Sequence, residues 1–189
     1  MLSRESFTTN TVNPIEYNSY AIAHAAEYIL STAKAKIPLE NNAYKLVETL
    51  NGTFGLFRED ELLGWVKLGY RTINNTNYRD LEIAYIIQSA RKTRAFLILI
   101  NAIKQVVKLP ILIDGAVFDD GVKAISALHK RENFKVNLID LNTGELSDFE
   151  HIPQSAHIGI VVEGWGFPIG EMCEAPGGFG REYASFKLF

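Results

Sequence analysis

Apolar positions recur along the chain at two spacings, one typical of helices and one typical of strands. Spacings of three and four residues predict helices at 21–30, 43–50, 93–108 and 121–131. Short apolar or alternating runs bounded by turn residues predict strands at 54–57, 62–70, 81–88, 110–114, 134–140 and 157–162. The asparagine-rich segment 72–79 is predicted to be a loop. This mixture of elements predicts an α/β chain.

Capping and turn residues mark the ends of several predicted elements. Asn18 or Ser19 can cap the first helix. Asn42 can cap the second helix, and Gly52 is placed to end it in the left-handed conformation. The charged segment 58–61 is predicted to join the first two strands as a hairpin.

Composition limits the classes of protein to which the chain can belong. Its 189 residues, 47% of them hydrophobic and 22% charged, have the balance of one ordinary globular domain. The net charge of −3 provides no overall positive field, so we expect no nucleic-acid partner. A single cysteine, Cys173, excludes an intrachain disulfide. The amino-terminal residues lack the apolar core of a signal peptide, and polar residues interrupt the longest apolar zone, 95–113. We therefore expect a cytoplasmic protein that does not span a membrane.

Three cations stand where a predicted strand passes into a predicted helix. Strand 81–88 is followed by Arg91, Lys92 and Arg94, and an apolar helix begins within this turn. The start of a helix carries partial positive charge and unpaired N–H groups, so cations there favour a bound anion such as phosphate. The alternative is a solvated turn whose cations pair with surface carboxylates.

The end of the chain differs in composition from the rest. Residues 164–189 are rich in glycine and in large aromatic side chains, whereas residues 1–163 are expected to form the main domain. So many aromatic rings are poorly placed in water, and they must be buried somewhere. This extension either folds back on its own domain or docks on another copy or an assembly partner; for its last ten residues we favour a partner.

Three stretches follow one another in an order that can be compared with known families. Residues 56–68, Leu-Phe-Arg-Glu-Asp-Glu-Leu-Leu-Gly-Trp-Val-Lys-Leu, contain a central glycine, Gly64. Strand 81–88 leads through the basic turn into a helix, and residues 127–134 read Ala-Leu-His-Lys-Arg-Glu-Asn-Phe. Over roughly residues 21–145 the chain resembles the GCN5-related N-acetyltransferase (GNAT) superfamily, and a divergent, phage-encoded member would fit.

The resemblance implies a fold and a cofactor. The expected fold is a mixed, mostly antiparallel sheet with helices on both faces. Strands 81–88 and 110–114 would splay, with the pantetheine arm of acetyl-CoA lying between them. The family's pyrophosphate loop contains glycines. Arg94 and Phe96 stand at those places in one register, and Arg91 and Thr93 in the other, so the loop is degenerate in both. The residues implied in cofactor binding are Ile86, Ile87, Gln88, Arg91, Lys92, Thr93, Arg94, Ala95 and Phe96.

The resemblance also implies two catalytic residues. Glu82 lies on the strand that often holds the family's base, and like-charge repulsion from Asp80 would raise its pKa. His129 stands where the family's late motif has a tyrosine acid. The alternatives are an exposed carboxylate at a strand end and a surface histidine. No histidine or cysteine spacing indicates a metal site.

Two functions remain open from the sequence. The first is an acyl-CoA-dependent N-acyltransferase whose acceptor is an unknown amine. The second is a catalytically inactive GNAT-like protein that serves as a binding or assembly subunit, such as a component of a virion. The basic turn, Glu82 and His129 favour the first function, whereas the missing loop glycines and the aromatic extension favour the second.

Overall fold

The structure is a computed structural model that describes residues 16–39, 43–91, 93–114, 119–150 and 155–166. Its elements, in chain order, are α2 (Ser19–Ser31), β1 (Ala33–Pro38), β2 (Tyr44–Thr49), β3 (Thr53–Arg58), β4 (Glu61–Ile73), β5 (Thr76–Ile86), the 3₁₀ helix η1 (Gln88–Ala90), α3 (Ala95–Val106), β6 (Ile111–Ile113), α4 (Asp119–His129), β7 (Phe134–Asp140), β8 (Leu146–Asp148) and β9 (Ile158–Gly164). None of the described helices is long and apolar enough to cross a membrane.

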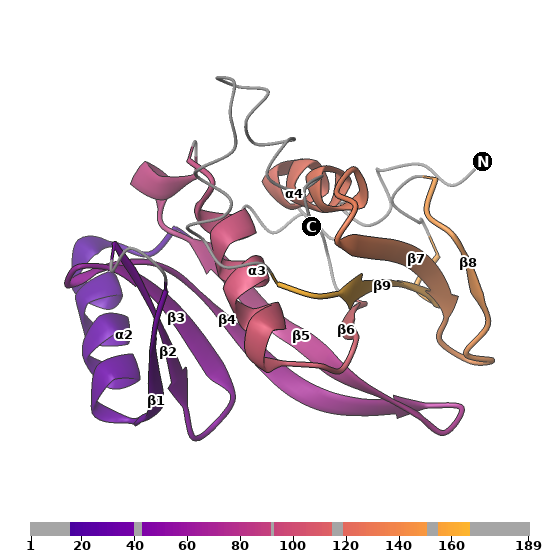
Figure 1. The fold of residues 1–189 in the computed structure, drawn as a ribbon, viewed down its shortest axis with the longest axis horizontal. Helices are drawn as coiled ribbons and strands as arrows, with labels where there is room; N and C mark the ends of the chain where they lie inside the picture. The colour runs from indigo at the N-terminus through magenta and orange to yellow at the C-terminus, as the bar shows by residue number, and fades with distance from the viewer. Residues whose placement is uncertain (1–15, 40–42, 92, 115–118, 151–154, 167–189) are drawn as a thin grey trace. The chain divides into compact units, whose positions relative to one another are not determined.

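The strands form a mixed sheet in the hydrogen-bonding order β1-β2-β3-β4-β5-β6-β9-β7-β8 (Figure 1). The pairs β1/β2, β2/β3, β3/β4, β6/β9, β7/β9 and β7/β8 are antiparallel. In contrast, β5 and β6 are parallel, with Arg79 beside Ile111 and Asp80 beside Leu112. The predicted mixed, mostly antiparallel sheet is therefore confirmed.

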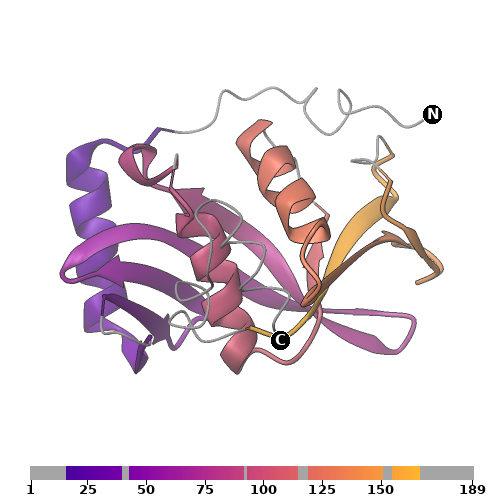
Figure 2. The ribbon, with the colours of Figure 1, turned by 45° about the horizontal axis from the view of Figure 1, so that its top comes forward.

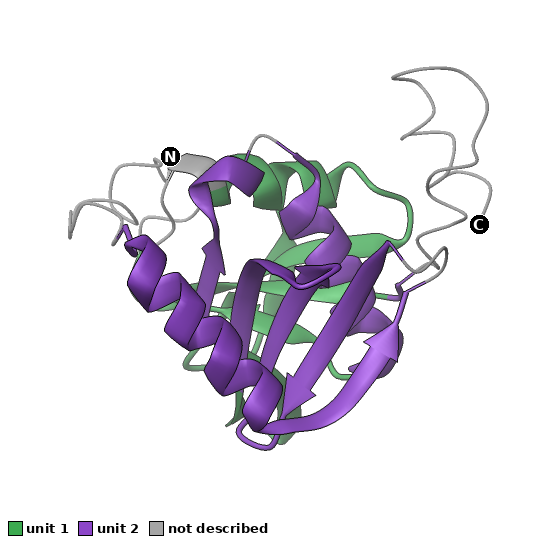
Figure 3. Ribbon diagram, turned by 90° about the vertical axis from the view of Figure 1, so that its left-hand side faces the viewer, with its two compact units in different colours: residues 1–15, 69–82, 109–164 green, residues 16–68, 83–108, 165–189 purple. Residues whose placement is uncertain are grey.

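The chain divides into two compact units (Figure 3). In the described residues, unit 1 comprises 69–82, 109–114, 119–150 and 155–164, and unit 2 comprises 16–39, 43–68, 83–91, 93–108 and 165–166. Strands β4 and β5 each contribute residues to both units.

Helices cover both faces of the strands in unit 2 (Figure 2). The side chain of Asn18 caps α2 by accepting a hydrogen bond from the Ala21 backbone N–H at 2.9 Å, as predicted. Helix α2 packs on β2 and β3 through a core of Ile29, Val47, Phe57, Leu62, Trp65 and Tyr85. Leu46 and Leu56 pair across β2 and β3, are fully buried and point to the opposite face, where α3 contacts the same strands.

The predicted helix at 43–50 is wrong, because these residues form strand β2. Strand β2 pairs with β3 through a turn at Asn51 and Gly52, and Gly52 adopts a φ of 81°. An Asn-Gly pair between two apolar runs is a strong hairpin signal, and it outweighs the weak helical spacing of a short segment. Strand β1, which the sequence analysis did not predict, pairs with the outer edge of β2.

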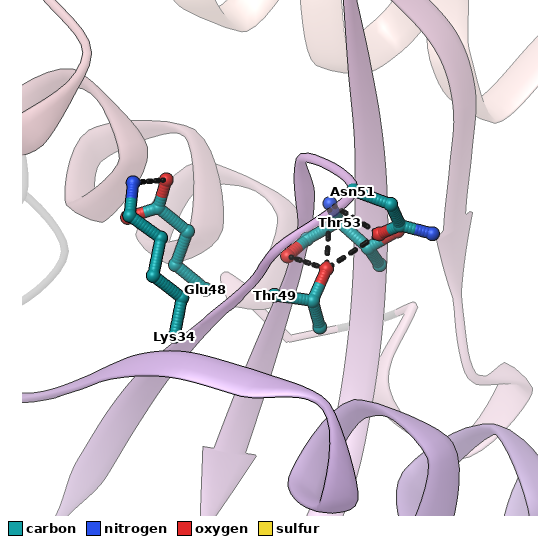
Figure 4. A network of polar contacts seen from close by, with 5 residues as sticks. All are labelled: Lys34, Glu48, Thr49, Asn51 and Thr53. Atoms are coloured by element: carbon teal, nitrogen blue, oxygen red, sulfur yellow. Dashed lines mark hydrogen bonds and ion pairs between the residues drawn. The ribbon is translucent and has the colours of Figure 1, made fainter.

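Side chains around this turn form a small polar network (Figure 4). The hydroxyl of Thr49 donates to Asn51 Oδ1 at 2.6 Å and accepts from the Thr53 backbone N–H at 3.0 Å. On the neighbouring strand pair, Lys34 Nζ lies 3.2 Å from Glu48 Oε1 and joins β1 to β2. The contacts of Thr49 fix the β2–β3 turn in its hairpin conformation.

Unit 1 is built around β6, β9, β7 and β8, together with parts of β4 and β5. One apolar cluster joins Ile73, Tyr78, Leu112, Ile139 and Val161, and helix α4 packs on β7. The predicted loop at 72–79 is wrong, because a two-residue turn at Asn74 and Asn75 joins β4 directly to β5. Both asparagines have positive φ, 46° and 63°, which this residue type tolerates well. Strand β8 was also not predicted.

Candidate functional site

The basic turn lies in unit 2, between the end of β5 and the start of α3. Ile87 N–H donates to the Leu63 carbonyl at 3.0 Å, which holds the end of β5 against β4. The short helix η1 follows, and α3 begins after Arg94. The predicted order of strand, turn and helix is therefore confirmed, although α3 is shorter at both ends than expected.

Thr93 organises the first turn of α3. Its hydroxyl donates to the Ala90 carbonyl at 2.6 Å and accepts from the Ala95 backbone N–H at 3.2 Å. The first turn of α3 contains no acidic residue. No carboxylate of this turn therefore offsets the partial positive charge at the start of the helix.

Several contacts within unit 2 hold the side chain of Arg91. Its Nη1 and Nη2 atoms lie 2.6 and 3.0 Å from the two carboxylate oxygens of Glu16. Its Nε donates to the Ile86 carbonyl at 2.9 Å, and its guanidinium lies over the ring of Tyr85, 5.4 Å from the centroid. The hydrogen bonds from Arg91 are the main cause that lowers the pKa of Glu16. One cation of the turn thus pairs with a carboxylate, as the alternative interpretation expected.

The other residues implied in cofactor binding differ in exposure. Gln88, Thr93 and Arg94 are exposed, whereas Ala95 is buried under the start of α3. Ile86, Ile87 and Phe96 are partly buried. Lys92 lies outside the described residues. The side chains best placed to meet a ligand from solvent are therefore those of Gln88, Thr93 and Arg94.

Gly64 allows β4 to approach β5 closely at the beginning of this turn. A Cβ atom at Gly64 would lie 2.6 Å from the Tyr85 carbonyl oxygen and 3.1 Å from Ile86 Cα. Backbone atoms cannot move aside cheaply, so the position requires glycine. This is the glycine that the family resemblance singled out in the hairpin.

Unit 1 contains a carboxyl cluster on β5 and after β6. Asp80 and Glu82 lie two residues apart on β5 and point to the same face, and Asp114 follows β6 and pairs with Arg71. Within the described part of the chain, Asp80 Oδ1 is buried and accepts no hydrogen bond. Burial is the main cause that raises the pKa of Asp80; Asp114 and Glu82 raise it further, and Arg71 opposes them.

The sequence predicts repulsion between Asp80 and Glu82 but does not single out Asp80. The structure singles it out because Asp80 is aligned with the fully buried Leu112, and this pairing with β6 shields its Oδ1 atom from water. Glu82 is exposed, and its carboxyl group lies against Gly69 on β4. The alternation of side chains along a strand could have indicated that Asp80 and Glu82 share a face, but it could not have indicated that Asp80 Oδ1 is buried.

Arg79 and Tyr70 form a second arrangement that the sequence analysis missed. Arg79 is only 8% exposed, its Nε donates to the Gly69 carbonyl at 3.0 Å, and its guanidinium lies 4.3 Å from the centroid of the Tyr70 ring. The Arg79 side chain therefore fixes the segment of β4 against which the Glu82 carboxyl group lies.

His129 lies in a different part of unit 1. It is the exposed last residue of α4, and its ring lies 5.1 Å from that of Phe149, beside a hollow of about 320 Å³ along β7. In the sheet order, β6 and β9 separate β5, which holds Glu82, from β7, on which α4 packs. Three strand spacings amount to about 14 Å. The two implied catalytic residues are therefore not adjacent.

Histidine, cysteine and carboxylate side chains are the usual ligands of a protein metal site. Within the described ranges, no group of three or more histidine, cysteine, aspartate or glutamate side chains could hold a metal ion. Cys173 and His151 lie outside those ranges.

Comparisons with known proteins give matches only among solved structures. No protein-family model and no curated protein matches the chain. One similar structure is Arabidopsis thaliana Naa50 in complex with the bisubstrate analogue CoA-Ac-MVNAL, with 13% identity, a TM-score of 0.35, and coverage of 83% of this chain and 87% of that one. Another, from Bacteroides thetaiotaomicron, is assigned to the GNAT family of acetyltransferases, with 14% identity, a TM-score of 0.36, and coverage of 85% and 78%.

Proposed function

We propose that this protein is an acyl-CoA-dependent N-acyltransferase. One observation carries the proposal: β5 pairs with β6 in parallel at Arg79 and Asp80, yet β5 continues to Ile86 and leads through η1 into α3. In the described residues the pairing of β5 with β6 stops at Asp80. The backbone N–H and C=O groups of β5 beyond Asp80 can therefore form hydrogen bonds with another partner on that side of the strand. An extended ligand with amide groups, such as the pantetheine arm, can pair with a strand in this way.

The start of α3 is the proposed site for the phosphates of acetyl-CoA. Arg94 is exposed at the N-cap position, Thr93 orders the turn, and the first turn carries no acidic residue. A helix start of this kind favours phosphate, and a nearby guanidinium strengthens the contact through charge-assisted hydrogen bonds. The remaining implied residues of the loop would line the same ligand.

The proposed chemistry needs a proton acceptor and a proton donor. Bound acetyl-CoA supplies the acyl group as a thioester. Glu82 is the proposed base, because its exposed carboxyl group can take a proton from an acceptor ammonium before the amine attacks. His129 is the proposed acid for the leaving thiolate. Because β6 and β9 separate the two parts of unit 1 that hold them, the two roles need independent tests.

Calorimetric titration with acetyl-CoA tests the binding step. We expect micromolar affinity for the wild type, and a loss of about 1–3 kcal/mol when Arg91 and Arg94 are both changed to Ala. Arg58→Ala is a matched control, because it removes an exposed, carboxylate-paired arginine from the same unit. No binding at millimolar acetyl-CoA would overturn the proposal.

Turnover measurements test the two catalytic assignments. Glu82→Gln and His129→Phe should each lower the rate of acyl transfer on the order of 10²-fold or more, with little change in acetyl-CoA affinity. Full activity in one variant would refute the catalytic role proposed for that residue and would leave the other assignment untouched.

The second candidate function is a binding or assembly subunit without catalysis. The pairing of Arg91 with Glu16 favours it, because a cation expected at a phosphate is already engaged by a carboxylate. Under this proposal the extension 164–189, of which residues 167–189 lie outside the described residues, provides the docking surface. Light scattering during size-exclusion chromatography of the full chain and of residues 1–179 tests it: loss of self-association without loss of folding supports assembly through the extension.

A further inference from the structure

We infer that Glu16 is an internal anion that occupies Arg91 and thereby lowers the affinity of the basic turn for phosphate-bearing ligands. The inference rests on the proposed function, which assigns the basic turn to phosphate binding. It adds that ligand binding at Arg91 requires Glu16 to leave, so that Glu16 sets how tightly the ligand binds.

The geometry of Arg91 supports competition rather than simple pairing. The Nε atom is fixed by the Ile86 carbonyl at 2.9 Å, which orients the guanidinium plane independently of Glu16. The two terminal nitrogens then face the Glu16 carboxylate at 2.6 and 3.0 Å. A guanidinium binds carboxylate and phosphate through the same two-pronged arrangement. The position that a phosphate group would take is therefore the one that Glu16 holds.

The neighbouring aromatic residues hold Glu16 near Arg91. Tyr85 Oη lies 3.3 Å from Glu16 Oε2 and accepts a hydrogen bond from the Tyr17 backbone N–H, also at 3.3 Å. The Tyr17 ring packs against Tyr85 and Trp65, with centroid distances of 4.8 and 5.5 Å. A carboxylate tethered in this way competes at a high effective concentration.

Glu16 can leave its ion pair with Arg91 more easily than Arg91 can. The side chain of Glu16 is 46% exposed, whereas that of Arg91 is 22% exposed and is also held by Ile86. An exposed ion pair is a weak interaction, so a ligand with more negative charge can displace Glu16 toward water. Arg91 would stay in place and accept the new anion.

The test compares inorganic pyrophosphate binding to four variants of the full chain by calorimetry at fixed salt. Glu16→Gln should bind pyrophosphate roughly two- to fivefold tighter than the wild type, which is the upper part of the range for releasing an exposed ion pair. Glu61→Gln is the matched control, because it removes the same charge from another exposed arginine pair in unit 2 and should change affinity less than twofold. Arg91→Ala and the double variant Glu16→Gln/Arg91→Ala should show no such gain.

A ligand-free measurement checks the same contact. Phenylglyoxal modifies accessible arginines, and peptide mass spectrometry locates the label. Arg91 should be labelled several-fold faster in Glu16→Gln than in the wild type or in Glu61→Gln. Equal pyrophosphate affinity in Glu16→Gln and wild type, absent binding in both, or a gain that persists without Arg91, would overturn the inference.

Acetyl-CoA titrations separate this inference from the proposed function. If Glu16→Gln gains affinity for pyrophosphate but acetyl-CoA binds no more tightly than pyrophosphate and yields no acylated product, the inference stands and the acyltransferase proposal fails. If acetyl-CoA binds and reacts while Glu16→Gln matches the wild type with both ligands, the proposed function stands and the inference fails.

Discussion

The carboxyl group of Glu82 lies so close to Gly69 that no side chain fits at residue 69 without moving it. A Cβ atom at Gly69 would overlap Glu82 Oε1, whereas no backbone atom of another strand stands as close. The obstructing atom is the end of a flexible, exposed side chain, which can swing into water. Gly69 therefore leaves the space that the Glu82 carboxyl group occupies, without being required by the fold.

Gly69→Ala should lower the rate of acyl transfer by about tenfold or more, because it displaces the proposed base. The melting temperature should change by only a few degrees, since the side chain that moves is exposed. Turnover and thermal melting measured in parallel check this. Wild-type turnover in Gly69→Ala would show that the position of the Glu82 carboxyl group does not matter to the reaction.

Gly64→Ala, in contrast to Gly69→Ala, should mainly reduce the stability of the fold. The added Cβ would meet the Tyr85 carbonyl oxygen and Ile86 Cα, and β4 and β5 would have to separate. We expect a loss of about 1–3 kcal/mol in the free energy of unfolding, typical of overpacking. Urea denaturation of Gly64→Ala beside Gly69→Ala provides the comparison, and equal stability of the two variants would contradict the close approach seen here.

Asp80→Asn should stabilise the protein at neutral pH. Burial and the nearby carboxylates raise the pKa of folded Asp80 above its ordinary value of 3.8, so the folded state binds this proton more tightly than the unfolded state. The contribution of Asp80 to stability is therefore lost as the pH rises from about 3.8 through the raised pKa.

The stability gain of Asp80→Asn over the wild type should thus be largest at pH 7 and shrink toward pH 4. Urea denaturation at several pH values measures this difference. Asp148→Asn, a change at an exposed position of β8, is the control and should give a smaller and flatter difference. A stability gain of Asp80→Asn that grows as the pH falls would contradict a raised pKa of Asp80 in the folded state.

A double-mutant cycle on Arg79 and Tyr70 should give a coupling of about 0.5–2 kcal/mol, because the guanidinium lies directly over the ring. The variants Arg79→Met, Tyr70→Leu and their combination, compared by urea denaturation, measure it. Arg79→Met should also lower the free energy of unfolding more than Tyr70→Leu does, since it removes the hydrogen bond to the Gly69 carbonyl as well. Additive effects would mean that the stacking contributes nothing.

The sequence predicted those parts of the fold in which local signals agree. The charged turn at 58–61 and the continuous apolar run of α3 each had one interpretation, and both elements are confirmed. The segment 43–50 failed because eight residues are too few to distinguish helical from strand spacing. Its pairing with β3, a tertiary contact, decides the outcome.

The candidate site was less predictable because its key partners are distant in sequence. Glu16 lies 75 residues from Arg91, and no local pattern connects them. The burial of Asp80 likewise depends on its alignment with Leu112 in the parallel pair. Residue types and spacing identified the cations and carboxylates, but only the folded chain shows what each one meets.

The long hairpin of β4 and β5 has a consequence for folding kinetics. Its two strands are joined by only Asn74 and Asn75, so pairing them loses little loop entropy, and such hairpins form in about 1–10 μs. In the sheet order, β3 adds to the free side of β4 and β6 to the free side of β5. The hairpin can therefore act as a nucleus from which the sheet grows in both directions. Replacing Asn74 with valine, which resists positive φ, should accordingly slow folding more than it accelerates unfolding.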